Sequence, residues 1–166
     1  MTTAKVTRAG LRLILVVGLA MTLWIGSAAG ASAARRPSWH LASSAMGTFT
    51  YQAGPVTIKV PSGCFLTVSM KYDESNAGIG TTRAGTDCVG PAAILPRLFC
   101  NRKMTFSYYN NDNKRYFFWA SQVSTNCKTF TSYEVPYSVR GQYGKMCARF
   151  YVAGTHRKTT CIQVHS

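Results

Sequence analysis

Alternation of apolar and polar residues is the dominant pattern of the chain from residue 56 onward, and it predicts β-strands. In residues 56–60, 64–72 and 102–109, every second residue falls on one face, and that face is mostly apolar. Residues 115–123 carry apolar residues on both faces, which predicts a central strand covered on both sides. Residues 127–139 are rich in Thr and Tyr and predict a further strand, broken at the proline near its end.

The segments between these strands carry residues typical of turns and loops. Residues 73–87 are polar and glycine-rich and predict a loop, whereas residues 110–113 (NNDN) predict a tight turn. Residues 91–99 are apolar but contain two prolines, which favours an edge strand or an extended connector. Residues 34–50 precede the first periodic segment, and we predict that they form a flexible N-terminal arm.

The number and spacing of the predicted strands define the fold class. About seven or eight short strands, with turns at intervals of roughly ten residues, are typical of sandwiches and small barrels. No segment after the N-terminal region shows a sustained helical period. We therefore predict an all-β domain over residues 51–166. Its architecture is a small disulfide-stapled antiparallel β-sandwich, and a small β-barrel is the alternative.

The two C-terminal cysteines stand at equal distances from a glycine. Cys147 and Cys161 each lie seven residues from Gly154. A hairpin with a three-residue loop at 153–155 therefore places the two cysteines opposite each other. Opposite residues in a non-hydrogen-bonded pair have Cα atoms about 4.5 Å apart, which is close enough for a disulfide. The spacing predicts a cross-strand Cys147–Cys161 disulfide.

The same register assigns the side chains of this hairpin to two faces. One face gathers the apolar residues Met146, Ala148, Phe150, Val152, Ile162 and Val164, with Lys158 as a misfit near the tip. The other face carries the cysteines and the candidate binding residues Lys145, Arg149, Tyr151 and Arg157. We expect this basic face to be exposed to solvent.

All six cysteines follow residue 33, and an even number of cysteines in an exported chain predicts a disulfide framework. Besides Cys147–Cys161 we predict the pairs Cys64–Cys88 and Cys100–Cys127, each of which closes a hairpin-like segment. A zinc site would need Cys or His residues at closer spacing than this sequence offers. We therefore expect no metal and no cofactor.

The first 33 residues have the composition of an export signal. A basic region with Lys5, Arg8 and Arg12 precedes the apolar residues 13–26, and small residues follow up to Ala33. This order predicts a helical secretory signal peptide over residues 1–33, typical of bacteria, whose removal releases a secreted, extracellular protein. The protein would then meet the membrane only during export. The alternative is an uncleaved anchor, because 22 residues without charge are enough to span a bilayer.

Charge narrows the choice of partner. The chain has 19 Lys and Arg residues against five acidic residues, and three of the basic residues lie in the predicted signal. The exported chain therefore keeps 16 basic residues and has a net charge near +11. Such a field attracts polyanions and acidic protein surfaces. We predict a monomeric binding protein for a cell-wall polymer, a polysaccharide or a nucleic acid, with Lys114 and Arg115 joining the basic face of the terminal hairpin.

Other functions remain open on the sequence alone. Glu134 and His156 could act as base and acid of a small secreted hydrolase or nuclease. A rigid loop at 73–87 could instead insert into another protein, as in a secreted inhibitor or toxin. The aromatic residues of segment 108–119 lie beside Lys114 and Arg115 and either stack on sugars or bases or fill the core. We favour binding over catalysis, because no positioned nucleophile, base or metal stands out.

Overall fold

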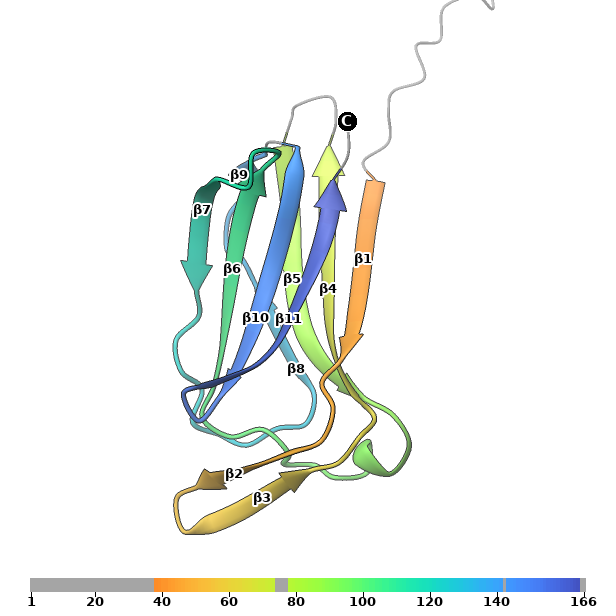
Figure 1. The fold of residues 1–166 in the computed structure, drawn as a ribbon, viewed down its shortest axis with the longest axis vertical. Helices are drawn as coiled ribbons and strands as arrows, with labels where there is room; N and C mark the ends of the chain where they lie inside the picture. Colours follow the sequence, from red (N-terminus) through yellow and green to blue (C-terminus); the bar gives the residue numbers. More distant parts are fainter. Residues whose placement is uncertain (1–37, 74–77, 142, 165–166) are drawn as a thin grey trace, which may run out of the picture. The chain divides into compact units, whose positions relative to one another are not determined.

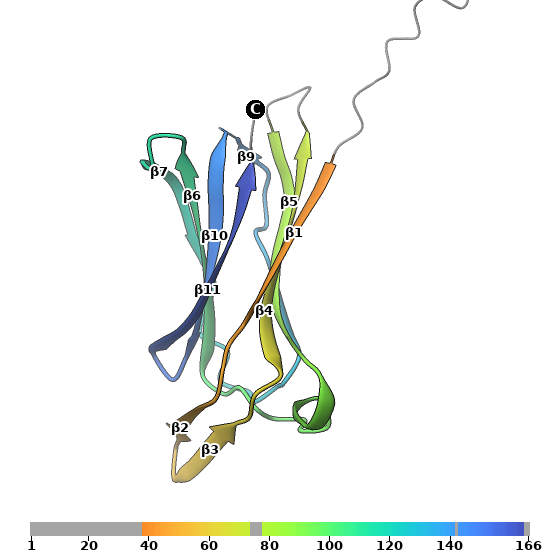
Figure 2. The same cartoon turned by 45° about the vertical axis from the view of Figure 1, so that its right-hand side comes forward.

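The computed structural model describes residues 38–73, 78–141 and 143–164, and these residues form two antiparallel β-sheets that face each other (Figures 1 and 2). The predicted signal peptide, residues 1–33, lies outside the described residues. Within the described part of the chain, no helix has the length and hydropathy of a membrane span. The sandwich architecture predicted from the strand pattern is confirmed.

The first sheet has the order β1-β4-β5-β8, and a short strand β9 also pairs with β5. Its strands are β1 (Ser38–Ala45), β4 (Cys64–Asp73), β5 (Gly78–Cys88), β8 (Thr131–Glu134) and β9 (Val139–Arg140). The second sheet has the order β11-β10-β6-β7. Its strands are β6 (Arg102–Asn110), β7 (Arg115–Ala120), β10 (Gly144–Val152) and β11 (Thr155–Val164). A separate hairpin of β2 (Phe49–Ala53) and β3 (Val56–Val60) lies at one end (Figure 1).

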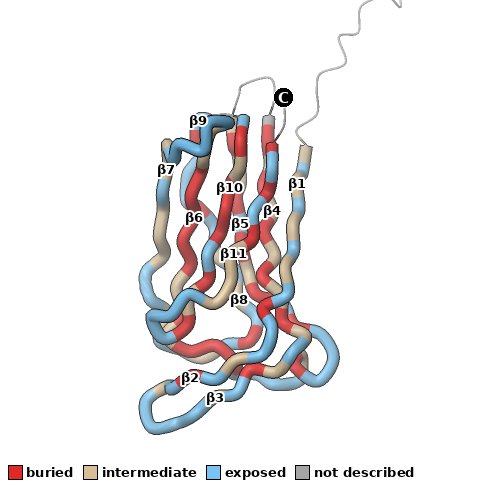
Figure 3. The backbone as a smooth tube through the Cα atoms, in the orientation of Figure 1, coloured by how far each residue is buried: buried red, intermediate tan, exposed pale blue. Residues whose placement is uncertain are grey.

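The core lies between the two sheets, because alternate residues of the central strands point inward. Leu66, Val68 and Met70 of β4 and Phe150 of β10 are all fully buried, and Figure 3 shows buried residues concentrated along the central strands. Burial of each such side chain contributes about 1.5–3 kcal/mol. The Thr160 hydroxyl on β11 donates to the Leu66 carbonyl at 3.1 Å and so links the two sheets.

One pair of buried hydroxyl groups in the core lacks full hydrogen bonding. The Tyr108 hydroxyl on β6 faces the Thr82 hydroxyl on β5, but neither oxygen has a hydrogen-bond partner at normal geometry. Both side chains are almost completely buried. Burial therefore favours the neutral form of Tyr108, and the Thr82 hydroxyl offsets this only in part.

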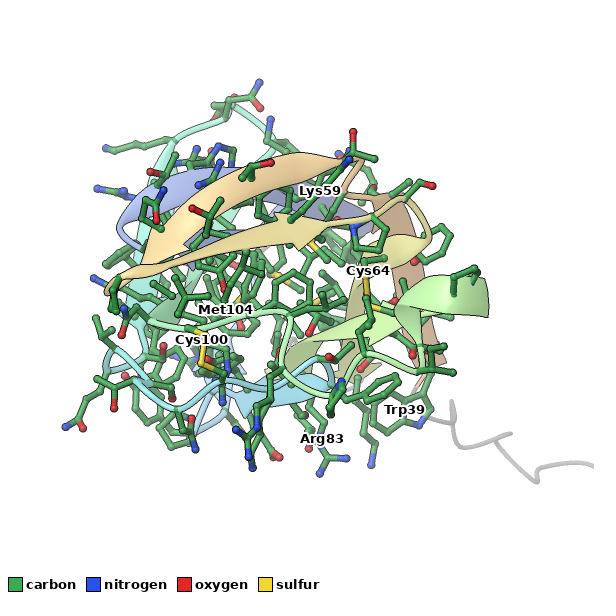
Figure 4. All side chains as sticks on the ribbon, turned by 90° about the horizontal axis from the view of Figure 1, so that it is seen from below. Trp39, Lys59, Cys64, Arg83, Cys100 and Met104 are labelled. Carbon is green, nitrogen blue, oxygen red and sulfur yellow. A yellow bond between two sulfur atoms is a disulfide. The ribbon has the colours of Figure 1, made fainter. Side chains whose placement is uncertain are left out.

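All three predicted disulfides are confirmed. Cys64–Cys88 and Cys147–Cys161 have Cα–Cα distances of 4.0 Å, and Cys100–Cys127 has a distance of 4.1 Å. Each bond joins one cysteine to the next cysteine in the sequence. Figure 4 shows the sulfur–sulfur bonds at Cys64 and Cys100, with Met104 in the interior and Arg83 pointing away from it.

The terminal hairpin keeps the predicted register over most of its length but differs at its tip. Cys147 lies opposite Cys161, and Phe150 lies opposite Lys158, as predicted. The loop has two residues rather than three, with positive φ at both Ala153 (50°) and Gly154 (77°), as in the tight turns that suit twisted hairpins. A bulge at Arg157 adds back one residue, so the two differences cancel before the strands reach the cysteines.

Two segments predicted to be irregular are strands. Ser38–Ala45, from the predicted flexible arm at 34–50, is β1 and pairs with β4 along its whole length. Gly78–Cys88, from the predicted loop at 73–87, is β5 and pairs with β4, β8 and β9. Their Ser, Thr, Ala and Gly residues give little hydrophobic alternation, yet their backbone groups complete the hydrogen bonding of a sheet whose inner face is supplied mainly by β4.

Residues 115–123 also differ from the prediction, whereas residues 91–99 take one of the two predicted forms. Strand β7 ends at Ala120 and lies at the edge of its sheet, paired only with β6, rather than at the centre. Its inward rings, Phe117 and Trp119, are only partly buried, and beyond β5 the first sheet has only the short strands β8 and β9. Of the two forms predicted for residues 91–99, the connector is the one observed: it follows the 3-10 turn Gly90–Ala92, and its pairing is limited to the isolated bridge between Phe99 and Lys128.

A candidate ligand-binding groove on the second sheet

The outer face of the second sheet carries most of the residues predicted to bind. In β10, inward residues alternate with Lys145, Arg149 and Tyr151, which point outward, so these three share one face as predicted. Arg149 is exposed, and the other two are half-buried. The neighbouring strand β6 places Lys103 opposite Tyr151 and Thr105 opposite Arg149. Basic and polar side chains from two adjacent strands therefore meet on this surface.

A groove of about 670 Å³ lies across one end of this face. We call it the basic groove and define it by the residues that line it: Asn101, Lys103, Thr105, Phe118, Val123, Arg149, Tyr151, Ala153 and Gly154. They come from β6 and the residue before it, from β7 and the segment that follows it, from β10 and from the β10–β11 turn. Its volume falls in the range of typical ligand sites.

The two ends of the groove are held by backbone hydrogen bonds. The Ala153 N–H donates to the Asn101 carbonyl at 3.0 Å, which ties the β10–β11 turn to the start of β6. Arg102 and Ser124 exchange two backbone hydrogen bonds of 3.0 and 2.9 Å, which fix the segment next to Val123. The groove is therefore formed by ordered backbone rather than by loose loops.

Aromatic and apolar side chains form part of the groove. Phe118 on β7 is 49 % exposed. It points outward because side chains alternate along a strand and its two neighbours, Phe117 and Trp119, point inward. The Arg115 guanidinium lies over the Phe118 ring, 5.2 Å from its centroid. On the β10 side, the Tyr151 ring contacts the His156 ring at a centroid distance of 5.5 Å. The groove therefore combines cations with accessible aromatic rings.

No carboxylate lines the basic groove. Among the described residues, the ion pair that forms is Arg83–Glu134 at 2.8 Å, on the outer face of the other sheet. Asp87 accepts a hydrogen bond from the Cys88 N–H at 2.9 Å, and Asp112 lies in the β6–β7 turn. Lys103 and Arg149 therefore have no counter-ion within the described part of the chain, and their positive potential is directed into the groove.

Arg157 is not on this face, contrary to the prediction. The bulge turns its side chain toward the β2–β3 hairpin, where its guanidinium lies 4.5 Å from the Phe49 ring centroid and 6.0 Å from that of Tyr51. Its Nε atom is buried without a hydrogen-bond partner. Arg157 therefore stabilises the contact between two parts of the fold, by about 0.5–2 kcal/mol for such a cation–π pair.

The remaining predicted residues flank the basic groove without lining it. Lys145 shares its face but lies toward the other end of the sheet, with its ammonium 5.4 Å from the Tyr109 ring centroid. Arg115 reaches the groove indirectly, through its contact with Phe118. Lys114 is exposed in the β6–β7 turn, where its N–H donates to the Asn110 side chain at 2.9 Å.

Lys103 and Phe118 are functional candidates that the sequence analysis did not single out. Phe118 has the spacing of a core residue, and only the pairing of β7 with β6 shows that it points outward, opposite Ser107. Lys103 opposes Tyr151 only because β6 lies beside β10. The signal that would have found both is the order of strands in the sheet, which the sequence alone does not provide.

The residues proposed for a hydrolase are not brought together. Glu134 lies on the outer face of the first sheet and pairs with Arg83. His156 lies at the tip of the terminal hairpin of the second sheet, where its Nε2 atom is 2.8 Å from the Thr159 hydroxyl. Among the described residues, no three His, Cys, Asp or Glu side chains cluster in a way that would hold a metal ion.

Comparisons with protein families, with curated protein sequences and with solved structures found no match for this chain. Its functional interpretation therefore depends on the site itself. The three disulfides are compatible with an extracellular location.

Proposed function

We propose that this protein is a secreted binding protein that holds an anionic polymer in the basic groove. The observation that carries the proposal is the pair Lys103 and Arg149, which face one groove without a counter-ion among the described residues. Both side chains are donors only, and the oxygens of phosphate, sulfate and carboxylate groups are acceptors. Three disulfides in so small a domain support the secreted location.

Charge outside the groove extends the same surface. Arg115 and Lys145 share the outer face of the second sheet, and Lys114 lies in the turn beside it. A polymer that crosses the groove would meet these cations on either side. A long polyanion therefore gains contacts that a single anionic group does not, so affinity should rise with polymer length.

The test is the salt dependence of binding to labelled polyanions: polyphosphate, a heparin-derived oligosaccharide and the single strand dT12. Binding to dT12 should weaken with salt, with a log–log slope of about −0.7 for each phosphate contacted. The double variant Lys103→Ala/Arg149→Ala should weaken binding about tenfold or more and make this slope shallower by about 1 to 1.5.

A matched control removes the same charge elsewhere. Lys59 on β3 and Lys128 before β8 are both exposed and lie outside the groove. The variant Lys59→Ala/Lys128→Ala should therefore bind nearly as the unchanged protein does. Salt-independent binding, or equal losses in the two double variants, would overturn the proposal.

A further inference from the structure

We propose that the polymer bound in the basic groove is a single-stranded nucleic acid, with a base stacked on Phe118 while Lys103 and Arg149 hold phosphate oxygens. This inference rests on the proposed function and names its ligand. The ligand inferred here must carry both a flat ring and an anionic group, whereas the proposed function requires only the anionic group.

Phe118 is a rigid aromatic surface that the fold leaves uncovered. Its neighbours along the strand, Phe117 and Trp119, are anchored inward against Tyr108 and Phe106, at centroid distances of 5.2 and 5.5 Å. The ring of Phe118 therefore cannot turn into the core without breaking these contacts. Arg115 lies over the ring, and the side of Phe118 that faces the groove remains open. Stacking with a planar apolar surface would remove this exposed ring from water.

The polar groups of the groove match phosphate better than the hydroxyl groups of a sugar. Lys and Arg offer only hydrogen-bond donors, and phosphate oxygens are only acceptors. A sugar hydroxyl both donates and accepts, so a saccharide site needs carboxylate or amide acceptors as well. The groove has no carboxylate, and its side-chain acceptors are the Asn101 amide and the hydroxyl groups of Thr105 and Tyr151. Donors thus dominate, which favours a ligand whose polar atoms are phosphate oxygens over a polysaccharide.

The strand register places ring and cations at a separation that suits one nucleotide. Arg149 and Lys103 are diagonal neighbours across β10 and β6, at a Cβ–Cβ distance of roughly 7 Å. Phe118 on β7 stands opposite Ser107 of β6, whereas Arg149 on β10 stands opposite Thr105, two residues along β6. With strands about 4.8 Å apart and about 3.4 Å per residue, the Cβ atoms of Phe118 and Arg149 are roughly 12 Å apart, a distance that the arginine side chain and one nucleotide can span together. Tyr151 closes the opposite side of the groove. One phosphate and its base can therefore meet a cation and a ring together.

A double helix does not fit this arrangement, because its bases are stacked on one another and do not present a face to a protein ring. A duplex would use the cations alone. Three probes separate the cases: dT12, an abasic strand of the same length and charge, and the duplex dT12·dA12. The affinity for each probe is measured by fluorescence anisotropy at one salt concentration. The protein should bind dT12 about tenfold tighter than the abasic strand.

Variants of Phe118 test the ring directly. Phe118→Leu keeps an apolar side chain but removes the aromatic face, so it should weaken dT12 binding about tenfold and leave binding of the abasic strand unchanged. Phe118→Trp should retain binding of dT12. Phe130 is exposed to a similar extent, 52 % against 49 %, but lies outside the groove, so Phe130→Leu is the matched control.

The possible outcomes distinguish a failure of this inference from a failure of the proposed function. If the abasic strand binds as tightly as dT12, or if Phe118→Leu changes nothing, base stacking is wrong and the proposal that the basic groove binds polyanions stands. If the heparin-derived oligosaccharide binds and no nucleic acid does, the ligand class is wrong and the groove again stands. If no polyanion binds, both proposals fail together.

Discussion

Removal of one buried hydroxyl group, in the variant Tyr51→Phe, should destabilise the whole domain. Tyr51 belongs to β2 and is 5 % exposed. Its hydroxyl donates to the Leu98 carbonyl at 2.9 Å and accepts from the Cys100 N–H at 2.8 Å. These two hydrogen bonds tie the β2–β3 hairpin to the connector that leads into β6. Phenylalanine fills almost the same space, so the substitution isolates the effect of the hydroxyl.

The expected loss follows from the two backbone groups that the substitution leaves unpaired. Each buried donor or acceptor without a partner costs about 1–3 kcal/mol. We therefore expect Tyr51→Phe to lower the free energy of unfolding by about 3 kcal/mol, out of a total of about 5–15 kcal/mol for a domain of this kind. At about 3–4 °C for each kcal/mol, the thermal midpoint should fall by roughly 10 °C.

The measurement is denaturant unfolding followed by tryptophan fluorescence, with the disulfides kept oxidised. Tyr143→Phe is the control, because Tyr143 is exposed and its hydroxyl makes no hydrogen bond within the described part of the chain. The control should change stability by less than about 0.5 kcal/mol. A loss below about 1 kcal/mol in Tyr51→Phe would show that water or a backbone shift satisfies both groups, and would refute the reasoning.

Two further predictions concern pH and redox conditions. Burial raises the pKa of Tyr108 from 10.0 to about 12, so the unfolded state loses this proton first and stability should fall by about 2 kcal/mol between pH 10 and 12. Tyr108→Phe should flatten that part of a pH series of denaturation curves, and an unchanged slope would contradict the assignment. Graded reduction with alkylation and mass spectrometry should label Cys147 and Cys161 first, because Cys161 is exposed, whereas Cys64 and Cys88 are buried. Full reduction should remove about 3 kcal/mol per closed loop and unfold the domain, so an unchanged thermal midpoint would exclude this role.

The sequence was sufficient where side-chain alternation and cysteine spacing act together. Both identified the hairpin of β10 and β11, its register from the cysteines to Phe150, and the outward positions of Arg149 and Tyr151. The tip was wrong because a loop of three residues and a loop of two residues plus a bulge leave the same spacing between the cysteines. That single difference moved Arg157 from the basic face to the ring of Phe49.

Strands β1 and β5 were not predicted from the sequence. Both pair through backbone hydrogen bonds, but their side chains do not show the apolar–polar alternation that predicts a strand. The half-buried face of β1 carries small and polar residues while its large apolar residues Trp39 and Leu41 are exposed, and β5 is rich in Gly and Thr. Sheet order is a second property that local patterns do not contain. For this reason β7 was placed at the centre of a sheet, and neither Phe118 nor Lys103 was singled out for the candidate site.

The disulfides join the first cysteine to the second, the third to the fourth and the fifth to the sixth. A polypeptide made from its N-terminus, or threaded through a translocation pore in that direction, presents these sulfur atoms in the same order. Cys88 emerges before Cys100, and Cys127 before Cys147, so each pair is complete before a competitor arrives. Oxidation during synthesis can therefore reach the native pattern without help from an isomerase, which makes the protein well suited to compartments where such enzymes are scarce.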